Sequence, residues 1–245
     1  MRPLLYFVFI FLWNVKGQTS GFPLNAQNII DTGVIAGMSD GINIYDDYNP
    51  VLKGDSIRYC GDYVCDGWIE DYYNNGKLAH RGLYVMGQLQ TYYNFYPSGV
   101  KEREFIHTPD NKKVFTSYYP DGKLRKKIIF NKKNLVIDFE TYYQNGGPQI
   151  LEYYDEDGKQ LKQKKEFYPS KVLAKSIILI SSKKNLYEYR EYNEKGQLML
   201  FGSISISEDK ITREGEWIYF LPSGAIYKKE QYKRGELIKT IDLSR

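Results

Sequence analysis

A short phrase built around a turn recurs along the chain and limits what the chain can fold into. It reads YYNNGKL at 72–78, FYPSGVK at 95–101, SYYPDGKL at 117–124, YYQNGGP at 142–148 and FLPSGAI at 220–226. A catalytic motif has no reason to occur so often in one protein. A structural unit repeated in this way builds an array, and the function of an array lies in its surface.

Seven copies align on one turn residue, at intervals of 23, 23, 24, 25, 25 and 28 residues: Gly76, Gly99, Gly122, Gly146, Lys171, Gly196 and Gly224. Four positions earlier every copy has an aromatic residue: Tyr72, Phe95, Tyr118, Tyr142, Phe167, Tyr192 and Phe220. The residues between this aromatic and the glycine are of the types that favour turns, and glycine adopts a positive φ without steric cost. Each copy therefore predicts a strand end followed by a tight turn.

A second set of turns lies midway between the first: Gly87, Asn111, Asn134, Gly158, Asn185, Asp209 and Gly235. The segments between turns are rich in β-branched and aromatic residues, as in LRKKIIF and LVIDFETYY, and show no helical period. The sequence thus predicts an all-β fold. We expect an elongated antiparallel meander of about seven tandem β-hairpin repeats of 23–28 residues, with about fourteen strands in one open or curled sheet.

Side chains alternate faces along a strand, so the two adjacent aromatic positions lie on opposite faces. We interpret the first, constant aromatic as architecture. The second is tyrosine in the first five copies, and we expect four of these rings to be exposed binding residues: Tyr73, Tyr96, Tyr119 and Tyr143. Tyrosine offers a large contact area with little rotamer entropy to lose.

The aromatic–aromatic–turn–Gly–Lys–Leu phrase, with GEWIYFLPSG at 215–224 and the closing KRGEL, resembles the MORN-repeat variant family. Some bacterial members, the YwqK-like group, are labelled antitoxin components. The resemblance covers about residues 66–238, and Lys171 departs from it by replacing the glycine. It implies an elongated sheet of hairpins that serves as a binding or scaffolding surface, without catalytic residues.

The chain begins MRPLLYFVFIFLWNVKG, which has one arginine, an apolar run and a small-residue site at Gly17. This layout predicts a secretory signal peptide at 1–17, with an uncleaved anchor as the alternative, and the protein is expected to be periplasmic, in the cell envelope or secreted. The mature chain contains no later apolar run long enough to cross a membrane. Its net charge falls from +4 to +2, too little for a dedicated nucleic-acid binder.

Residues 18–65 precede the repeats and are expected to cap the open edge of the first one. In an exported chain the close pair Cys60 and Cys65 predicts a disulfide, across a hairpin loop formed by the four residues between them. At the other end, residues 239–245 are expected to form a tail. The two histidines lack ligand spacing to the cysteines, so no metal is expected; Asp40, Asp46 and Asp47 leave calcium as an alternative.

The sequence contains no nucleophile and histidine in a recognisable catalytic pattern and no phosphate-binding loop. We therefore expect an exported, non-enzymatic protein without a cofactor that binds another protein through its tyrosine-rich sheet, including an antitoxin- or immunity-like role. The alternative is an envelope module that binds glycans or lipid headgroups, with sugars stacked on the tyrosine column. A third reading, an enzyme, needs a pocket where residues 18–65 meet the first repeat.

Overall fold

The computed structural model describes residues 34–37, 42–45, 57–207 and 210–243. The predicted signal peptide, Asp40, Asp46, Asp47 and the turn at Asp209 lie outside these residues. All regular elements are strands except one short 3-10 turn, η1 (Ser182–Lys184). Within the described part of the chain, no helix has the length and apolar character needed to span a membrane.

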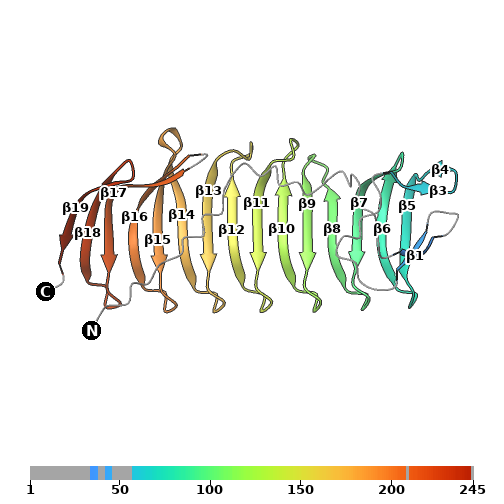
Figure 1. Ribbon diagram of the computed structural model, residues 1–245, viewed down its shortest axis with the longest axis horizontal. Coiled ribbons are helices and arrows are strands. Elements are labelled where there is room, and N and C mark those ends of the chain that lie inside the picture. Colours follow the sequence, from blue (N-terminus) through green and yellow to red (C-terminus); the bar gives the residue numbers. More distant parts are fainter. Residues whose placement is uncertain (1–33, 38–41, 46–56, 208–209, 244–245) are drawn as a thin grey trace.

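The strands are β1 (Val34–Gly37), β2 (Asn43–Tyr45), β3 (Tyr59–Cys60), β4 (Tyr63–Val64), β5 (Gly67–Tyr73), β6 (Leu78–Val85), β7 (Gln88–Phe95), β8 (Lys101–His107), β9 (Lys113–Tyr118), β10 (Leu124–Phe130), β11 (Val136–Tyr142), β12 (Pro148–Tyr154), β13 (Leu161–Phe167), β14 (Leu173–Ser181), β15 (Leu186–Tyr192), β16 (Leu198–Ser207), β17 (Lys210–Phe220), β18 (Ile226–Lys233) and β19 (Glu236–Asp242). From β5 to β19 each strand pairs antiparallel with the next along the chain, in one long layer (Figure 1). The predicted meander of hairpins is confirmed.

The N-terminal edge of this meander is paired with strands that are not part of the repeats. β2 runs parallel to β5, and β1 pairs antiparallel with β2, which gives a 17-stranded sheet. At the far edge β19 continues to Asp242, past the boundary at 239 where a tail is predicted, and all its residues are exposed. The two edges of the array therefore differ.

The predicted turn glycines have the expected backbone conformation. Gly76, Gly99, Gly122, Gly146, Gly196 and Gly224 have φ between 78° and 89°. Lys171, which replaces glycine in the fifth copy, adopts the same conformation, with φ of 71°. A side chain in the left-handed region is strained, so a favourable contact of the lysine side chain is needed to offset that strain.

Contacts between neighbouring turns explain the lysine. In most repeats the residue after the turn glycine lies beside the next copy's glycine; Val100, for example, lies against Gly122, and Lys123 against Gly146. In the fourth copy that following residue is Gly147, which leaves the space empty. Lys171 fills it from the other side, because a Cβ on Gly147 would lie 2.6 Å from its Cγ. The two departures from the repeat compensate each other.

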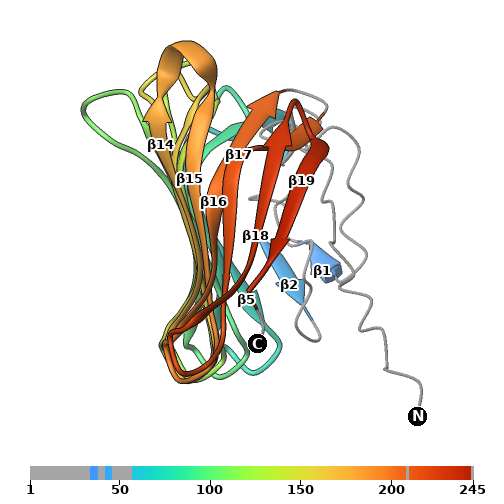
Figure 2. The same ribbon diagram turned by 90° about the vertical axis from the view of Figure 1, so that its left-hand side faces the viewer.

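The sheet has two faces that we name by their residues. The cap-side face carries Asp71 and His80, and β1 and β2 lie on its side (Figure 2). The opposite face carries Trp68 and Tyr93. Strand register aligns one row across the cap-side face of the first repeats, and most of its members are buried: Gly82, Tyr92, Phe105, Phe115, Ile128 and Phe139. A second cluster, Ile177, Tyr187, Leu200, Ile204 and Trp217, forms the core of the later repeats on the same face.

The predicted disulfide between Cys60 and Cys65 is present, with a Cα–Cα distance of 5.0 Å. The predicted four-residue loop is wrong, because Cys60 pairs with Tyr63 and only Gly61 and Asp62 form the turn. The bridge instead joins Cys60, the last residue of β3, to Cys65, the residue directly after β4, and the Cys65 amide donates to the Arg58 carbonyl at 2.8 Å. The hairpin loop is thus shorter than expected, and the bridge links one cysteine inside the strand pair to one directly after it.

Candidate functional site

The four tyrosines expected to bind a partner lie on the cap-side face, and their hydroxyls join consecutive repeats. Each donates a hydrogen bond to the carbonyl of the constant aromatic one repeat later: Tyr73 to Phe95 at 2.6 Å, Tyr96 to Tyr118 at 3.0 Å, Tyr119 to Tyr142 at 2.7 Å and Tyr143 to Phe167 at 2.8 Å. The expected exposure is wrong for Tyr73, which is only 2% exposed beneath Tyr45 and Ala79. The other three rings are half-buried, and their binding role stays a prediction.

The constant aromatic column lies on the opposite face, half-exposed rather than in the core. Its tyrosines bond to glutamates there, as Tyr118 does with Glu104 at 2.8 Å and Tyr142 with Glu140 at 2.8 Å. Burial and the hydrogen bond to Glu104 raise the pKa of Tyr118 to about 12, so its hydroxyl stays a donor. This face therefore presents aromatic rings held in place by carboxylates.

An aromatic patch on the opposite face of β5–β8 concentrates these features. The Trp68 and Tyr93 rings stack with centroids 6.2 Å apart. The Arg81 guanidinium lies 4.9 Å from the Trp68 centroid, and the Lys101 ammonium lies 5.1 Å from that of Tyr93. Lys101 also pairs with Glu104 at 2.7 Å. Trp68 is 46% exposed, so an indole that would usually be covered is open to solvent. We call Trp68, Arg81, Tyr93 and Lys101 the tryptophan patch.

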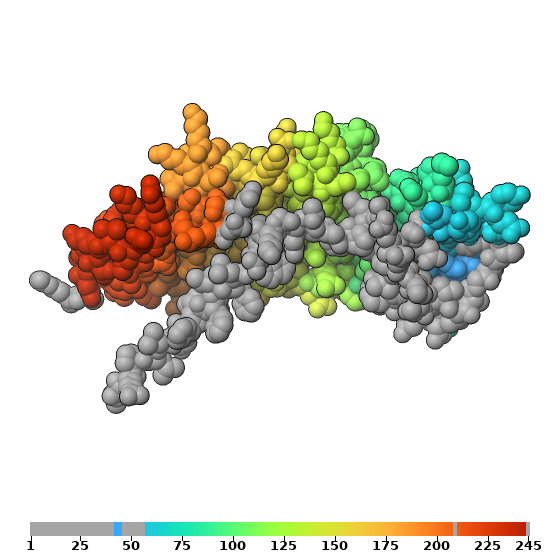
Figure 3. Space-filling view, turned by 45° about the horizontal axis from the view of Figure 1, so that its top comes forward, coloured from blue at the N-terminus to red at the C-terminus, as the bar shows by residue number. Residues whose placement is uncertain are grey.

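The β3–β4 hairpin adds a second exposed apolar group at the same end of the molecule (Figure 3). Tyr63 is 80% exposed, and Tyr59 and Met86 are also mostly exposed. Backbone hydrogen bonds from the Arg58 and Gly87 amides fix the hairpin to the β6–β7 turn. A Cβ on Gly87 would lie 2.7 Å from Ile57, so glycine is required for this close approach. The hairpin therefore presents its rings from a fixed support.

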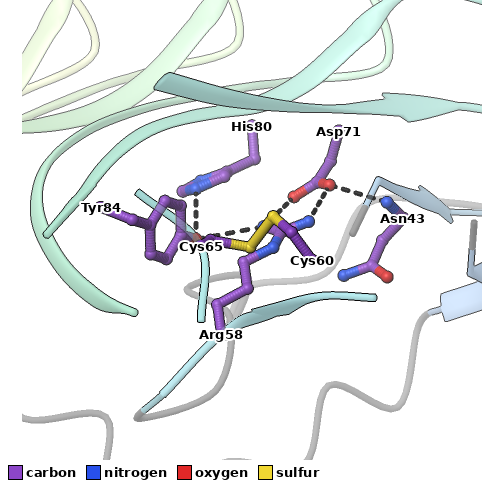
Figure 4. Close-up of a disulfide and its surroundings, with 7 residues drawn as sticks. All are labelled: Asn43, Arg58, Cys60, Cys65, Asp71, His80 and Tyr84. Atoms are coloured by element: carbon purple, nitrogen blue, oxygen red, sulfur yellow. Dashed lines mark hydrogen bonds and ion pairs between the residues drawn. A yellow bond between two sulfur atoms is a disulfide. The ribbon is translucent and has the colours of Figure 1, made fainter. Parts of the chain in front are cut away.

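A buried polar cluster lies beneath the hairpin (Figure 4). Both guanidinium nitrogens of Arg58 donate to the two Asp71 oxygens, and Asp71 also accepts from the Asn43 amide of β2 at 2.8 Å. Both side chains are at least 95% buried. The ion pair therefore joins three parts of the chain, the segment before β3, the edge strand β5 and the capping strand β2.

His80 continues this cluster as a neutral ring. Arg58 donates to the Tyr84 hydroxyl at 3.1 Å, which in turn lies 3.1 Å from His80 Nε2, while His80 Nδ1 lies 2.6 Å from the Asn94 side-chain oxygen. One proton arrangement satisfies all three contacts, with Tyr84 donating to Nε2 and Nδ1 donating to Asn94. Burial lowers the pKa of His80, which keeps the ring neutral. A histidine fully engaged in this way is structural.

Sequence reasoning missed both the tryptophan patch and the buried cluster. A signal for the cluster exists in the column directly before the constant aromatic, which is polar in the first six copies and tyrosine in the last: Asp71, Asn94, Ser117, Thr141, Glu166, Glu191 and Tyr219. Among the described residues, no three histidine, cysteine or acidic side chains are grouped so that they could hold a metal ion.

Comparison with known proteins identifies the repeat unit. The family model "MORN repeat variant" matches residues 113–132 and 213–234, which form the β9–β10 and β17–β18 hairpins. None of the curated proteins matches the sequence. Among solved structures, the crystal structure of TcdB2-TccC3-Cdc42 is 12% identical over 66% of this chain, with a TM-score of 0.18, and that of TcdB2-TccC3 is 13% identical over 66%, with a TM-score of 0.19. This chain spans 13% of each of those chains, so neither likeness bears on function.

Proposed function

We propose that this chain, which carries MORN-variant hairpins in both halves of its sheet, is an exported, non-enzymatic repeat protein that binds another protein through the tryptophan patch. A repeat array provides an extended surface on which neighbouring hairpins hold each other in place. An immunity-like role, in which the bound protein is a toxin, is the narrower form of this proposal.

The composition and rigidity of the tryptophan patch are the observation that supports it. Tryptophan, tyrosine and arginine carry most of the binding energy in protein interfaces. Here all three occur on paired strands, in register: Trp68 lies opposite Leu83, and Arg81 lies opposite both Glu70 and Tyr93. Side chains already held by stacking and ion pairs lose less entropy on binding than free ones. Tyr59 and Tyr63 of the β3–β4 hairpin are further exposed aromatic rings at the N-terminal end of the array.

The disulfide supports the exported location, because such bridges persist in oxidising compartments and are rare in the cytosol. The predicted signal peptide leads to the same compartment.

Capture of partners from a cell-envelope extract tests the binding surface. The protein is compared with a Trp68→Ala/Tyr93→Ala variant and with Tyr192→Ala, a matched change on the same face far from the patch. We expect a saturable protein partner whose affinity falls at least about tenfold in the double variant, as for the loss of one hot spot. Tyr192→Ala should change it less than about twofold.

Two outcomes contradict the proposal. One is the absence of any saturable partner. The other is a partner that binds the double variant as tightly as the unaltered protein, provided that circular dichroism shows both to be folded.

A further inference from the structure

The guanidinium of Arg213 on β17 lies over an aromatic ring on the cap-side face, in the later repeats. Its Cζ lies 4.2 Å from the centroid of Trp217, which is 1% exposed. The indole in turn lies on Gly202, where an added Cβ would come within 2.4 Å of the ring. The glycine therefore permits the close approach of the indole, and the indole supports the guanidinium from one side.

Within the described part of the chain, one nitrogen of Arg213 makes all of its hydrogen bonds. Nη1 donates to the Tyr219 hydroxyl at 2.8 Å, to the Tyr232 hydroxyl at 3.0 Å and to Glu230 at 3.5 Å. The hydroxyls of both tyrosines in turn donate hydrogen bonds to Glu230. The side chain is 37% exposed, and its Nε and Nη2 donors are not used in these bonds. These two donors form the edge that pairs with a carboxylate through two parallel hydrogen bonds.

The surroundings of this edge favour a ligand with one negative charge. Burial opposes ionisation of Glu230, but hydrogen bonds from Tyr219, Lys228 and Tyr232 outweigh it and lower its pKa, so Glu230 stays charged. Arg213 and Lys228 around this one carboxylate leave a single positive charge in the cluster. Glu230 repels a dianionic phosphate more strongly than a monoanionic carboxylate, and the single charge of a carboxylate matches the remaining positive charge.

Aliphatic residues flank the same edge. Arg213 lies directly opposite Ile204, and the next pair on this face is Ile206 and Ile211. Ile211 is about half exposed. The nearby indole is covered, so it offers no platform on which a sugar ring could stack. A peptide supplies aliphatic side chains next to its carboxylate, which a sugar acid does not.

We infer that the Nε and Nη2 edge of Arg213 binds the carboxylate of an acidic peptide segment whose neighbouring residues are aliphatic. This site lies on the other face and in the other half of the molecule from the tryptophan patch. It goes beyond the proposed function and can succeed or fail independently of it.

Titration of the purified protein with two short capped peptides, Ile-Asp-Ile and Ile-Asn-Ile, tests the site. Nitrogen–proton spectra report the Nε–H signal of Arg213 directly, and calorimetry gives the affinity. We expect the aspartate peptide to saturate the signal and to bind at least about tenfold more tightly than the asparagine peptide, as a charge-assisted pair implies.

Arg213→Lys keeps the charge and removes the paired donors, so binding should weaken at least about tenfold. The matched variant Arg190→Lys, on the opposite face, should leave the affinity unchanged. Tyr232→Phe keeps the free edge and removes one Nη1 partner, so a severalfold loss is expected and provides a second test if Arg213→Lys does not fold.

The inference is overturned if neither peptide saturates, if the asparagine peptide binds equally well, or if Arg213→Lys has no effect. Inorganic phosphate or glucuronate binding as tightly as the aspartate peptide would assign the site to anions in general or to a sugar acid, and would also overturn it.

Discussion

The two ends of the sheet are built from the same hairpin unit, yet their arginines are in opposite situations. At the N-terminal end Arg58 and Asp71 are at least 95% buried beneath the disulfide hairpin, and hydrogen bonds connect Arg58 through Tyr84 and His80 to Asn94. At the C-terminal end Arg213 is partly exposed with one edge unused, and the whole of β19 is exposed. Both arginines contact tyrosine hydroxyls and one carboxylate.

The difference shows what the non-repeating segment contributes. Burying a charged pair is favourable only when its remaining donors and acceptors are satisfied, and β2 and the β3–β4 hairpin supply those partners at one end. At the other end no added segment among the described residues covers the last hairpin, and every residue of β19 is exposed. The repeats supply a row of polar residues along the array. At the N-terminal end, β2 and the β3–β4 hairpin bury part of this row.

Removal of one ion-pair partner at each end should give the largest difference in the free energy of unfolding between the two ends. We expect Asp71→Asn to lower the free energy of unfolding by about 3–5 kcal/mol, because it leaves Arg58 buried without a counter-charge. Glu216→Gln removes an exposed partner of Lys229 at the open end and should cost about 0–1 kcal/mol. Urea denaturation measures both, and equal losses would contradict the contrast.

The disulfide should make the next largest contribution to the stability of the capped N-terminal end. It closes a short loop, for which chain entropy predicts a loss of about 2 kcal/mol when Cys60→Ser and Cys65→Ser are combined. A reducing agent should destabilise the unaltered protein to the same extent and leave the double variant unaffected. A reductant effect on the double variant would show that the loss has another origin.

The compensating turns provide a test inside the array, away from either end. Gly147→Ala should cost about 1–2 kcal/mol, because the new Cβ meets the Lys171 side chain. Gly147→Lys combined with Lys171→Gly restores the regular pattern and should be close to neutral. A double-mutant cycle measures the coupling, and strictly additive effects would contradict the proposed compensation.

The smallest expected effect compares the same inter-repeat bond in two settings. Tyr73→Phe leaves the Phe95 carbonyl short of a partner near the buried end and should cost about 1–2 kcal/mol. Tyr168→Phe removes the equivalent bond to Tyr192 where the ring is half-exposed, so water can replace the hydroxyl and about 0.5 kcal/mol is expected. A larger loss for Tyr168→Phe would reverse the comparison.

The turns and strand order were predictable because both depend on neighbours in the sequence. A glycine that needs a positive φ is visible in one repeat, and a meander pairs each strand with the next. The disulfide was predictable for the same reason, because its two cysteines are close in the sequence. The length of the loop between them was not, because it depends on whether Tyr63 belongs to the loop or pairs with Cys60, and no repeat pattern encodes that choice.

Which face becomes core could not be read from the repeat. Alternation places Tyr118 and Tyr119 on opposite faces but does not say which of the two faces becomes the core. The pair of Arg58 and Asp71 depends on the same packing across 13 positions of sequence. The exposure of Trp68 likewise follows from its face and not from its type.

Since each repeat strand of the meander pairs with its neighbours along the chain, the length of the sheet is set by the number of hairpins. Deletion or duplication of one hairpin leaves the order of strand pairing unchanged. It would shorten or lengthen the sheet by about 10 Å, the width of two strands. The capped end and the open end would keep their own structures at any such length. The distance between the two surfaces at these ends is therefore a property that evolution or engineering can change in fixed steps.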